Sequence, residues 1–295
     1  MEFGKLSPVE LEKVVFKLPD DAPLNKRVLT GTTASAFRIN LGLTNWGFSQ
    51  WAGNLYPPQI KEKDFLHYYS RQFNSIELNA THYKLYGAGT IAKWKQASPS
   101  GFLFCPKMFK EVTHKGSLMG TKALVEEFCE AIKSFDDRLG PLFIQLPETY
   151  SANRMSELLE FLNYLPKTYT FFLEVRHPDW FLSSQLFDHL QALGIGAVLT
   201  DTAGRRDCAH MQLTIPKAFI RFVANDQHPT DYKRIDEWAE RIKYWKNNGL
   251  EELSFFVHSP DEGKVLEIAA YAIERFNAVF EAGLKPLRLG GYTLF

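Results

Sequence analysis

The chain has 295 residues, which suggests two domains at about 150 residues each, although α/β barrels of about 250 residues fold as one unit. With 45% hydrophobic and 23% charged residues, the composition excludes a disordered, collagen-like or coiled-coil protein. Thirty-four basic residues balance thirty-four acidic ones, so the net charge of zero does not indicate a nucleic-acid or membrane partner.

The start of the chain differs from the rest. Ser7 is a candidate helix N-cap before Pro8, and a stretch containing proline and aspartate follows. Residues 30–35 read TGTTAS, which is typical of a polar linker. We therefore expect an N-terminal arm and linker over residues 1–36 and a single domain over residues 37–295.

Within this domain, short β-type runs alternate with amphipathic helical segments. The predicted strands cover residues 38–44, 75–79, 102–107, 141–147, 170–176, 195–201, 218–223 and 252–258. The predicted helices cover residues 61–73, 90–97, 121–136, 154–164, 184–193, 234–248 and 263–281. Strands that alternate with helices imply parallel pairing, and eight of them favour an α/β fold of the TIM type, a (β/α)8 barrel, over an open sheet.

Cysteine usage and apolar run lengths bear on the compartment. Cys105, Cys129 and Cys208 are widely spaced and form no CxxC pair, so neither a structural zinc site nor a disulfide framework is indicated. The first thirty residues lack the apolar segment of a secretory signal, and no apolar run reaches the eighteen residues of a spanning helix. We expect a cytoplasmic protein without a membrane partner, whose oligomeric state the sequence does not indicate.

Polar residues alternate with apolar ones in the predicted strands. In residues 75–79, Ile76 and Leu78 suit the helix layer, which directs Glu77 and Asn79 into the barrel. The same alternation on the other strands directs a further set inward: Thr44, Lys107, Gln145, Glu174, Arg176, Asp201, Arg221 and His258. Most of these residues stand near the carboxyl ends of their strands, so we expect one charge-balanced pocket at the C-terminal face.

This constellation has two interpretations. Buried charges must be paired, so the six charged groups could form a self-neutralising network with a structural role alone. Active sites of barrel enzymes, however, lie at the C-terminal face, and aliphatic residues usually fill the interior. A functional site is therefore the favoured interpretation.

Several motifs at these strand ends resemble a known family. They read GLTNW at 42–46, SIELNATHY at 75–83, FLFCPK at 102–107, QLP at 145–147 and EVRHPDW at 174–180. In this order, and with Asp201 and the spacing of Tyr232, Trp238 and Trp245, they resemble the domain of unknown function 72 family (YecE-like) over residues 38–275. The resemblance implies a TIM-type barrel but no activity, because the family is named for lacking one.

The predicted pocket residues support acid–base chemistry. Glu77 and Glu174 project from opposite sides of the barrel mouth, where two carboxyl groups in different environments can divide acid and base roles. Asp201 is the third catalytic candidate. Cations that suit phosphate or carboxylate oxygens, groups that orient a ligand and aromatics that stack on a ring form the substrate-binding set: Lys107, Arg176, Arg221, Asn79, Gln145, His258, Trp46 and Trp180.

No cofactor is predicted. The chain has no Walker loop, complete GxGxxG fingerprint, GxSxG elbow, HxH or HExxH motif. A divalent metal remains an alternative, for which Glu77, Glu174, Asp201 and His82 would be the oxygen and imidazole ligands.

The sequence thus predicts an enzyme that performs acid–base chemistry on a small anionic or sugar-like molecule. Two alternatives remain open. A nucleic-acid-binding or nucleic-acid-processing protein would contact the backbone through basic loops and stack bases on aromatics at the mouth. The basic residues in question are Lys107, Lys110, Lys115, Arg205 and Arg206. A non-catalytic binding module would use the same pocket without turnover.

Overall fold

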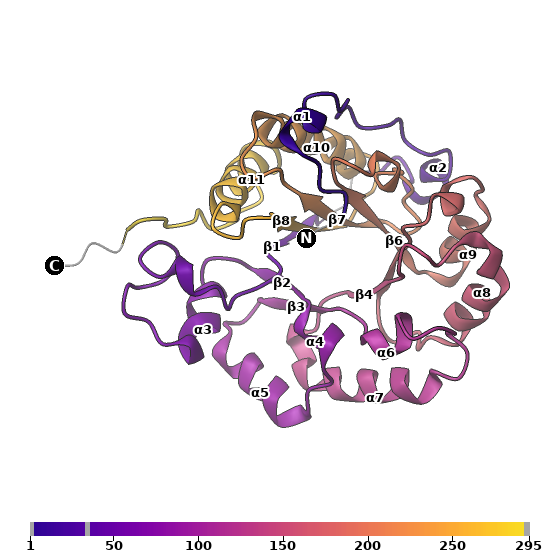
Figure 1. Ribbon diagram of the computed structural model, residues 1–295, viewed down its shortest axis with the longest axis horizontal. Coiled ribbons are helices and arrows are strands. Elements are labelled where there is room, and N and C mark those ends of the chain that lie inside the picture. The colour runs from indigo at the N-terminus through magenta and orange to yellow at the C-terminus, as the bar shows by residue number, and fades with distance from the viewer. Residues whose placement is uncertain (1–2, 33–35, 292–295) are drawn as a thin grey trace.

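The computed structural model describes residues 3–32 and 36–291 and has an α/β architecture (Figure 1). It contains a strand at each of the eight predicted positions. They are β1 Arg38–Gly42, β2 Ser75–Leu78, β3 Leu103–Pro106, β4 Leu142–Gln145, β5 Phe171–Glu174, β6 Gly196–Asp201, β7 Lys217–Val223 and β8 Glu252–His258. Figure 1 shows the strands around a common centre with the longer helices outside them.

The strands form two parallel sheets. Six of them pair in the order β1-β8-β7-β6-β5-β4, while β2 pairs with β3. Main-chain hydrogen bonds also join the two sheets. Glu77 N donates to Leu43 O over 3.0 Å, and Met108 N donates to Phe143 O over 2.9 Å. The β2–β3 pair therefore lies between β1 and β4.

Helices follow the strands along the chain. They are α3 Phe65–Tyr69, α4 Ala80–Tyr83, α5 Ala88–Ala97, α6 Lys110–Thr113, α7 Lys122–Ile132, α8 Met155–Tyr164, α9 Gln185–Leu193, α10 Pro229–Asn247 and α11 Val265–Phe280. The predicted helix over 121–136 is shorter, because α7 passes into a 3-10 helix that is broken at Asp136, where φ is 50°. Across residues 3–32 and 36–291, no helix is long and apolar enough to span a membrane.

The strands separate two buried regions. Their outward side chains pack on the helices in one large apolar core. The inward side chains form a second cluster of Cys105, Phe143, Phe172, Val198, Phe219 and Phe256. Phe219 is central to this cluster, since its ring centroid lies 5.3 Å from those of Phe143 and Phe172 and 5.1 Å from that of Phe256. This aromatic cluster closes the interior below the polar strand ends.

The N-terminal arm packs against the rest of the molecule. It contains α1 Pro8–Leu11, for which Ser7 is the predicted N-cap, and α2 Asn25–Val28. Trp245 on α10 donates its indole N–H to Asp21, over 3.0 Å to the nearer oxygen, and the Asn25 amide bonds the main chain at Met211 and Leu213. Residues 33–35 of the expected linker lie outside the described residues, and the domain boundary at 36 stays a prediction.

Candidate functional site

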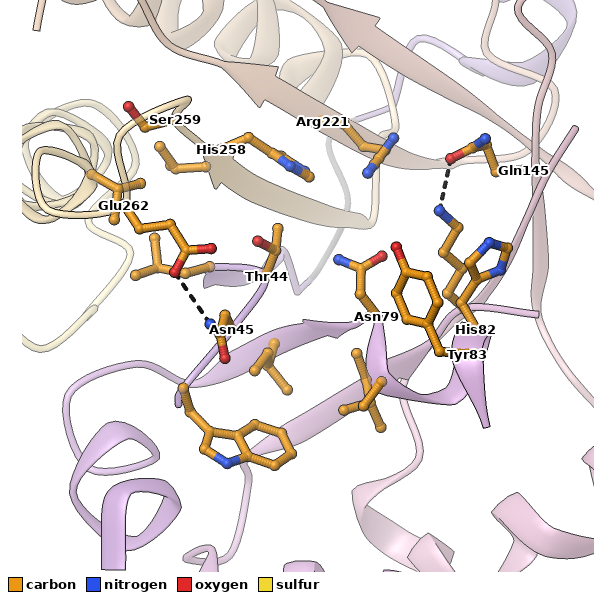
Figure 2. A pocket seen from close by; sticks show the side chains of 18 of the residues that line it. Thr44, Asn45, Asn79, His82, Tyr83, Gln145, Arg221, His258, Ser259 and Glu262 are labelled. Carbon is orange, nitrogen blue, oxygen red and sulfur yellow. Dashed lines mark hydrogen bonds between the residues drawn. The ribbon is translucent and has the colours of Figure 1, made fainter. Parts of the chain in front are cut away.

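A cavity of about 650 Å³ lies at the carboxyl ends of the strands (Figure 2). Most of the predicted binding residues line it, namely Trp46, Asn79, Lys107, Gln145, Arg176, Arg221 and His258, and so does Thr44, which is predicted to point inward. The candidate metal ligand His82 lines it as well, together with residues that the sequence does not predict, among them Phe3, Asn45, Tyr83, His114 and Glu262. The polar constellation expected from strand alternation is therefore largely assembled at one place.

Arg221 on β7 is the centre of the ionic network beneath the cavity. Its Nε and Nη2 donate to the two carboxylate oxygens of Glu77, each over 2.8 Å, and its Nη1 donates to Glu174 over 2.7 Å. All three side chains are at most 1% exposed. One guanidinium fork thus ties together β2, β5 and β7 with charge-assisted hydrogen bonds.

Further donors complete the coordination of both carboxylates. Glu174 accepts from Arg176 Nε over 2.7 Å, and Glu77 accepts from Asn79 Nδ2 over 2.9 Å. His258 Nε2 lies 3.1 Å from the second Glu77 oxygen. Every carboxylate oxygen of the pair therefore has at least one partner.

These contacts keep both carboxyl groups ionised. Burial raises the pKa of Glu174, but the charges of Arg176 and Arg221 outweigh it and lower the pKa to about 2. Burial likewise raises the pKa of Glu77, but Arg221 and His258 outweigh this effect, so the pKa of Glu77 lies well below its ordinary value. Groups held in this state accept hydrogen bonds from fixed partners and are poorly suited to donating a proton near neutral pH.

Lys107 follows β3 and faces the cavity. Its Nζ donates to Gln145 Oε1 over 2.7 Å and lies 5.7 Å from the centroid of the Phe143 ring. The side chain is buried, and burial together with the Arg221 charge lowers the pKa of the amine to about 7. Lys107 is thus an amine of the cavity that is deprotonated at a lower pH than an ordinary lysine.

His82 on α4 lines the same side of the cavity (Figure 2). Its Nδ1 lies 2.8 Å from Met108 O, and because a carbonyl oxygen only accepts, Nδ1 carries the hydrogen. Burial and the Lys107 charge lower the pKa of the ring to about 3. His82 is therefore neutral, and its Nε2 carries a lone pair.

Glu262 gives the cavity an acidic rim. It lies in the loop between β8 and α11 and accepts from Asn45 Nδ2 over 3.1 Å. In Figure 2 it stands on the other side of the cavity from Gln145 and His82. Strand alternation could not identify Glu262, but a polar residue just beyond a strand end is a usable signal in this fold.

Asp201 does not face the cavity, so its predicted inward orientation is wrong. Its carboxylate accepts from Trp238 Nε1 over 2.8 Å and pairs with Arg234 over 2.9 Å, both on α10, and also contacts Arg206. Residues 197–199 of the same strand are all apolar, so the sequence does not show which side chains of this strand face the interior and which face the helices. Val198 belongs to the interior cluster, which by alternation places Asp201 on the helix side.

Of the two predicted stacking aromatics, only Trp46 lines the cavity. Its ring packs edge-on against Trp94 at a centroid distance of 5.3 Å. Trp180 is 1% exposed, donates its indole N–H to Tyr150 O over 2.6 Å and packs parallel to the Tyr150 ring. The expectation that Trp180 lies at the mouth is wrong, because its polar atom finds a partner in the core.

The predicted metal ligands do not converge. Glu77 and Glu174 are occupied by arginines and Asp201 lies on the other face, while His82 bonds the main chain. Among residues 3–32 and 36–291, no group of three or more His, Cys, Asp or Glu side chains could hold a metal ion.

Three of the five basic residues of the nucleic-acid alternative have an acidic partner. Arg205 pairs with Asp207 over 2.7 Å, Arg206 contacts Asp201, and Lys115 lies 3.6 Å from Glu111. These pairs neutralise part of the basic set that would contact a phosphate backbone.

The N-terminal arm contributes one wall of the cavity. The guanidinium carbons of Arg176 and Arg205 lie 4.0 and 5.5 Å from the centroid of the Phe3 ring. Thr202 Oγ1 donates to Phe3 O over 3.2 Å, and Gly204 N donates to Gly4 O over 2.8 Å. Nothing in the sequence pattern indicated that Phe3 belongs to the site.

The curated relatives carry names without an activity. The chain is 27% identical over 252 residues to the UPF0759 protein YecE of Escherichia coli strain K12, covering 78% of this chain and 89% of that protein. It is 33% identical over 75 residues to the UPF0759 protein YunF of Bacillus subtilis strain 168, covering 25% and 26% of the two chains.

Solved structures agree in fold. A DUF72 family protein of Enterococcus faecalis V583 superposes with a TM-score of 0.63 at 15% identity, covering 84% of this chain and 99% of that one. A DUF72 family protein of Thermotoga maritima MSB8 gives a TM-score of 0.62 at 22% identity, with 83% and 99% coverage. The profile described as "Protein of unknown function DUF72" matches residues 40–288, and the chain therefore belongs to the DUF72 family.

Proposed function

We propose that the eight strands constitute a (β/α)8 barrel and that the cavity at their carboxyl ends is the active site of an enzyme. Its substrate is a small anionic or sugar-like molecule. The main-chain links between the two sheets and the interior cluster around Phe219 support the barrel. In such barrels the active site lies at this end.

The distribution of charge around the cavity carries the proposal. Arg221 and Arg176 pair with the carboxylates of Glu77 and Glu174 and neutralise them. These carboxylates therefore repel a bound anion only weakly. Lys107 adds a cation on the same side, while Glu262 stands on the acidic rim. A ligand with an anionic group at one end and hydrogen-bond donors at the other complements both sides.

The geometry changes the assignment of acid and base. Glu77 and Glu174 position Arg221 and Arg176, while proton transfer falls to Lys107, whose pKa of about 7 lies near neutral pH. Asn79 and Gln145 orient the ligand, and Trp46 offers an apolar face for a ring.

Thermal denaturation in different anions tests the site. Phosphate, sulfate and malonate should each raise the melting temperature above that in chloride at equal ionic strength, because a ligand of the native state stabilises it by mass action. The Arg176→Gln variant should lose this increase. Arg275→Gln, which removes a surface arginine paired with Asp236 and Glu240, should keep it. Equal melting temperatures in all four anions would contradict the proposal.

A further inference from the structure

Lys107 differs from the arginines that share its cavity. Arg221 and Arg176 are each fixed by a carboxylate, whereas the Lys107 amine has a neutral partner, Gln145 Oε1. Within the described residues Lys107 makes no ion pair. Its environment therefore holds the amine in place without requiring that it stay charged.

The surroundings of the amine favour its neutral form. Lys107 is 7% exposed, lies against the Phe143 ring and is close to the Arg221 charge. A lysine that is desolvated or placed next to other cations is the kind of amine that attacks carbonyl groups. With a pKa of about 7, close to half of the protein carries a nucleophilic amine at neutral pH.

We propose that Lys107 is a nucleophile that forms a Schiff base with a small carbonyl compound bearing an anionic group, such as a 2-oxo acid. The proposal rests on the proposed function, because the same cavity must admit the anion, and it adds the substrate class. Arg176 lies where it could hold the anionic group: its Nε binds Glu174, and its remaining guanidinium N–H groups donate no hydrogen bond within the described residues.

The chemistry balances without an oxidant or reductant. The Nζ lone pair attacks the carbonyl carbon, a C–N bond forms, and the electron pair of the C=O π bond moves to oxygen, which takes a proton. The nitrogen then gives up one proton, and its restored lone pair expels this oxygen as water after a second protonation of the oxygen. Overall, one ammonium and one carbonyl group give one iminium group and one water.

Two neighbours set the surroundings of the amine. Gln145 Oε1 accepts a hydrogen bond from Nζ, which orients the amine. His82 has a pKa of about 3, so its ring stays neutral and takes no proton from the ammonium; the proton lost before attack goes to water. Gln145 is thus a positioning residue, and His82 is a neutral neighbour that adds no charge beside the amine.

Reductive trapping of the full chain tests the proposal directly. The protein is incubated at pH 7 with glyoxylate or pyruvate and sodium cyanoborohydride, which reduces an iminium to a stable amine, and modified lysines are located by peptide mass mapping. Lys107 should be modified about tenfold faster or more than Lys110, since Lys107 is a buried amine whose neutral form is favoured. Phosphate should slow the reaction at Lys107 and leave Lys110 unchanged.

Two variants sharpen the test. Lys107→Arg keeps the positive charge but cannot form an imine, so the fast adduct should disappear, while Lys110→Arg should leave it unchanged. The map of the unaltered protein decides the matter even where Lys107→Arg fails to fold. Modification of Lys107 no faster than Lys110 with both acids overturns the Schiff base. It leaves the proposed function intact if phosphate still raises the melting temperature through Arg176. Selective modification without any anion effect supports the nucleophile and refutes the anion site.

Discussion

Arg221 on β7 and Glu77 on β2 meet through two hydrogen bonds of 2.8 Å although their strands are not neighbours. The pair spans the interior above the inward-facing cluster that contains Phe143, Phe172 and Phe219. The structural interpretation of the charged residues therefore fits the network around Arg221, and a functional role stays a prediction. The network around Arg221 is self-neutralising, whereas Lys107 stands outside it and faces the cavity.

Replacing Arg221 by Met should strongly destabilise the fold. The substitution leaves Glu77 without its bidentate partner and Glu174 with Arg176 alone, and removing one partner of a buried ion pair costs about 3–5 kcal/mol. Urea unfolding at pH 7 measures this loss. Arg275→Gln on the surface should cost at most about 1 kcal/mol. Similar losses for the two variants would contradict the central role of Arg221.

Acid should weaken the fold through the same carboxylates. The pKa of Glu174 is about 2 in the folded protein against 4.5 ordinarily, so its contribution is present above about pH 4.5 and is lost as the pH falls toward 2. This single group accounts for roughly 3 kcal/mol of unfolding free energy. Unfolding free energies measured between pH 6 and 2.5 should fall less steeply for Glu174→Gln than for the parent.

Strand alternation predicted most of the site because the strands that carry it have an unambiguous pattern. Glu77 stands between Ile76 and Leu78, so the polar face is evident, and the interior contacts of Arg221 and His258 follow in the same way. It failed for Asp201, because apolar residues occupy both faces of β6. It could not find Phe3 at all, since the contact joins segments almost two hundred residues apart and depends on the path of the arm.

Asp201 should be essential for stability and irrelevant to ligand binding. Asp201→Asn removes the charge that compensates Arg234 and Arg206 and weakens the acceptor of the Trp238 N–H, so we expect a loss of about 3–5 kcal/mol. Because the side chain points to α10, the rise of the melting temperature in phosphate should be retained. If Asp201→Asn is folded but its melting temperature no longer rises in phosphate, Asp201 contributes to ligand binding.

Phe3 should limit access to Arg176. Its ring covers the guanidinium at 4.0 Å, and the arm is held there by hydrogen bonds from Thr202 and Gly204 to its carbonyl oxygens. Phe3→Ala removes the ring and a cation–π contact of about 0.5–1 kcal/mol, a small loss of stability. Phenylglyoxal, which modifies accessible guanidinium groups, should then label Arg176 several-fold faster, as followed by peptide mass mapping.

Two further variants separate the ring from the arm. Gly4→Ala should accelerate labelling of Arg176 as well, because Gly4 has a φ of 70° and a Cβ there would lie 2.5 Å from Thr202 side-chain atoms, which displaces the arm with Phe3 attached. Val15→Ala changes an arm residue that is 79% exposed and should leave the rate unchanged. If Arg176 reacts equally fast in the parent and in Phe3→Ala, the ring does not shield the guanidinium, and anions reach the cavity without any movement of the arm.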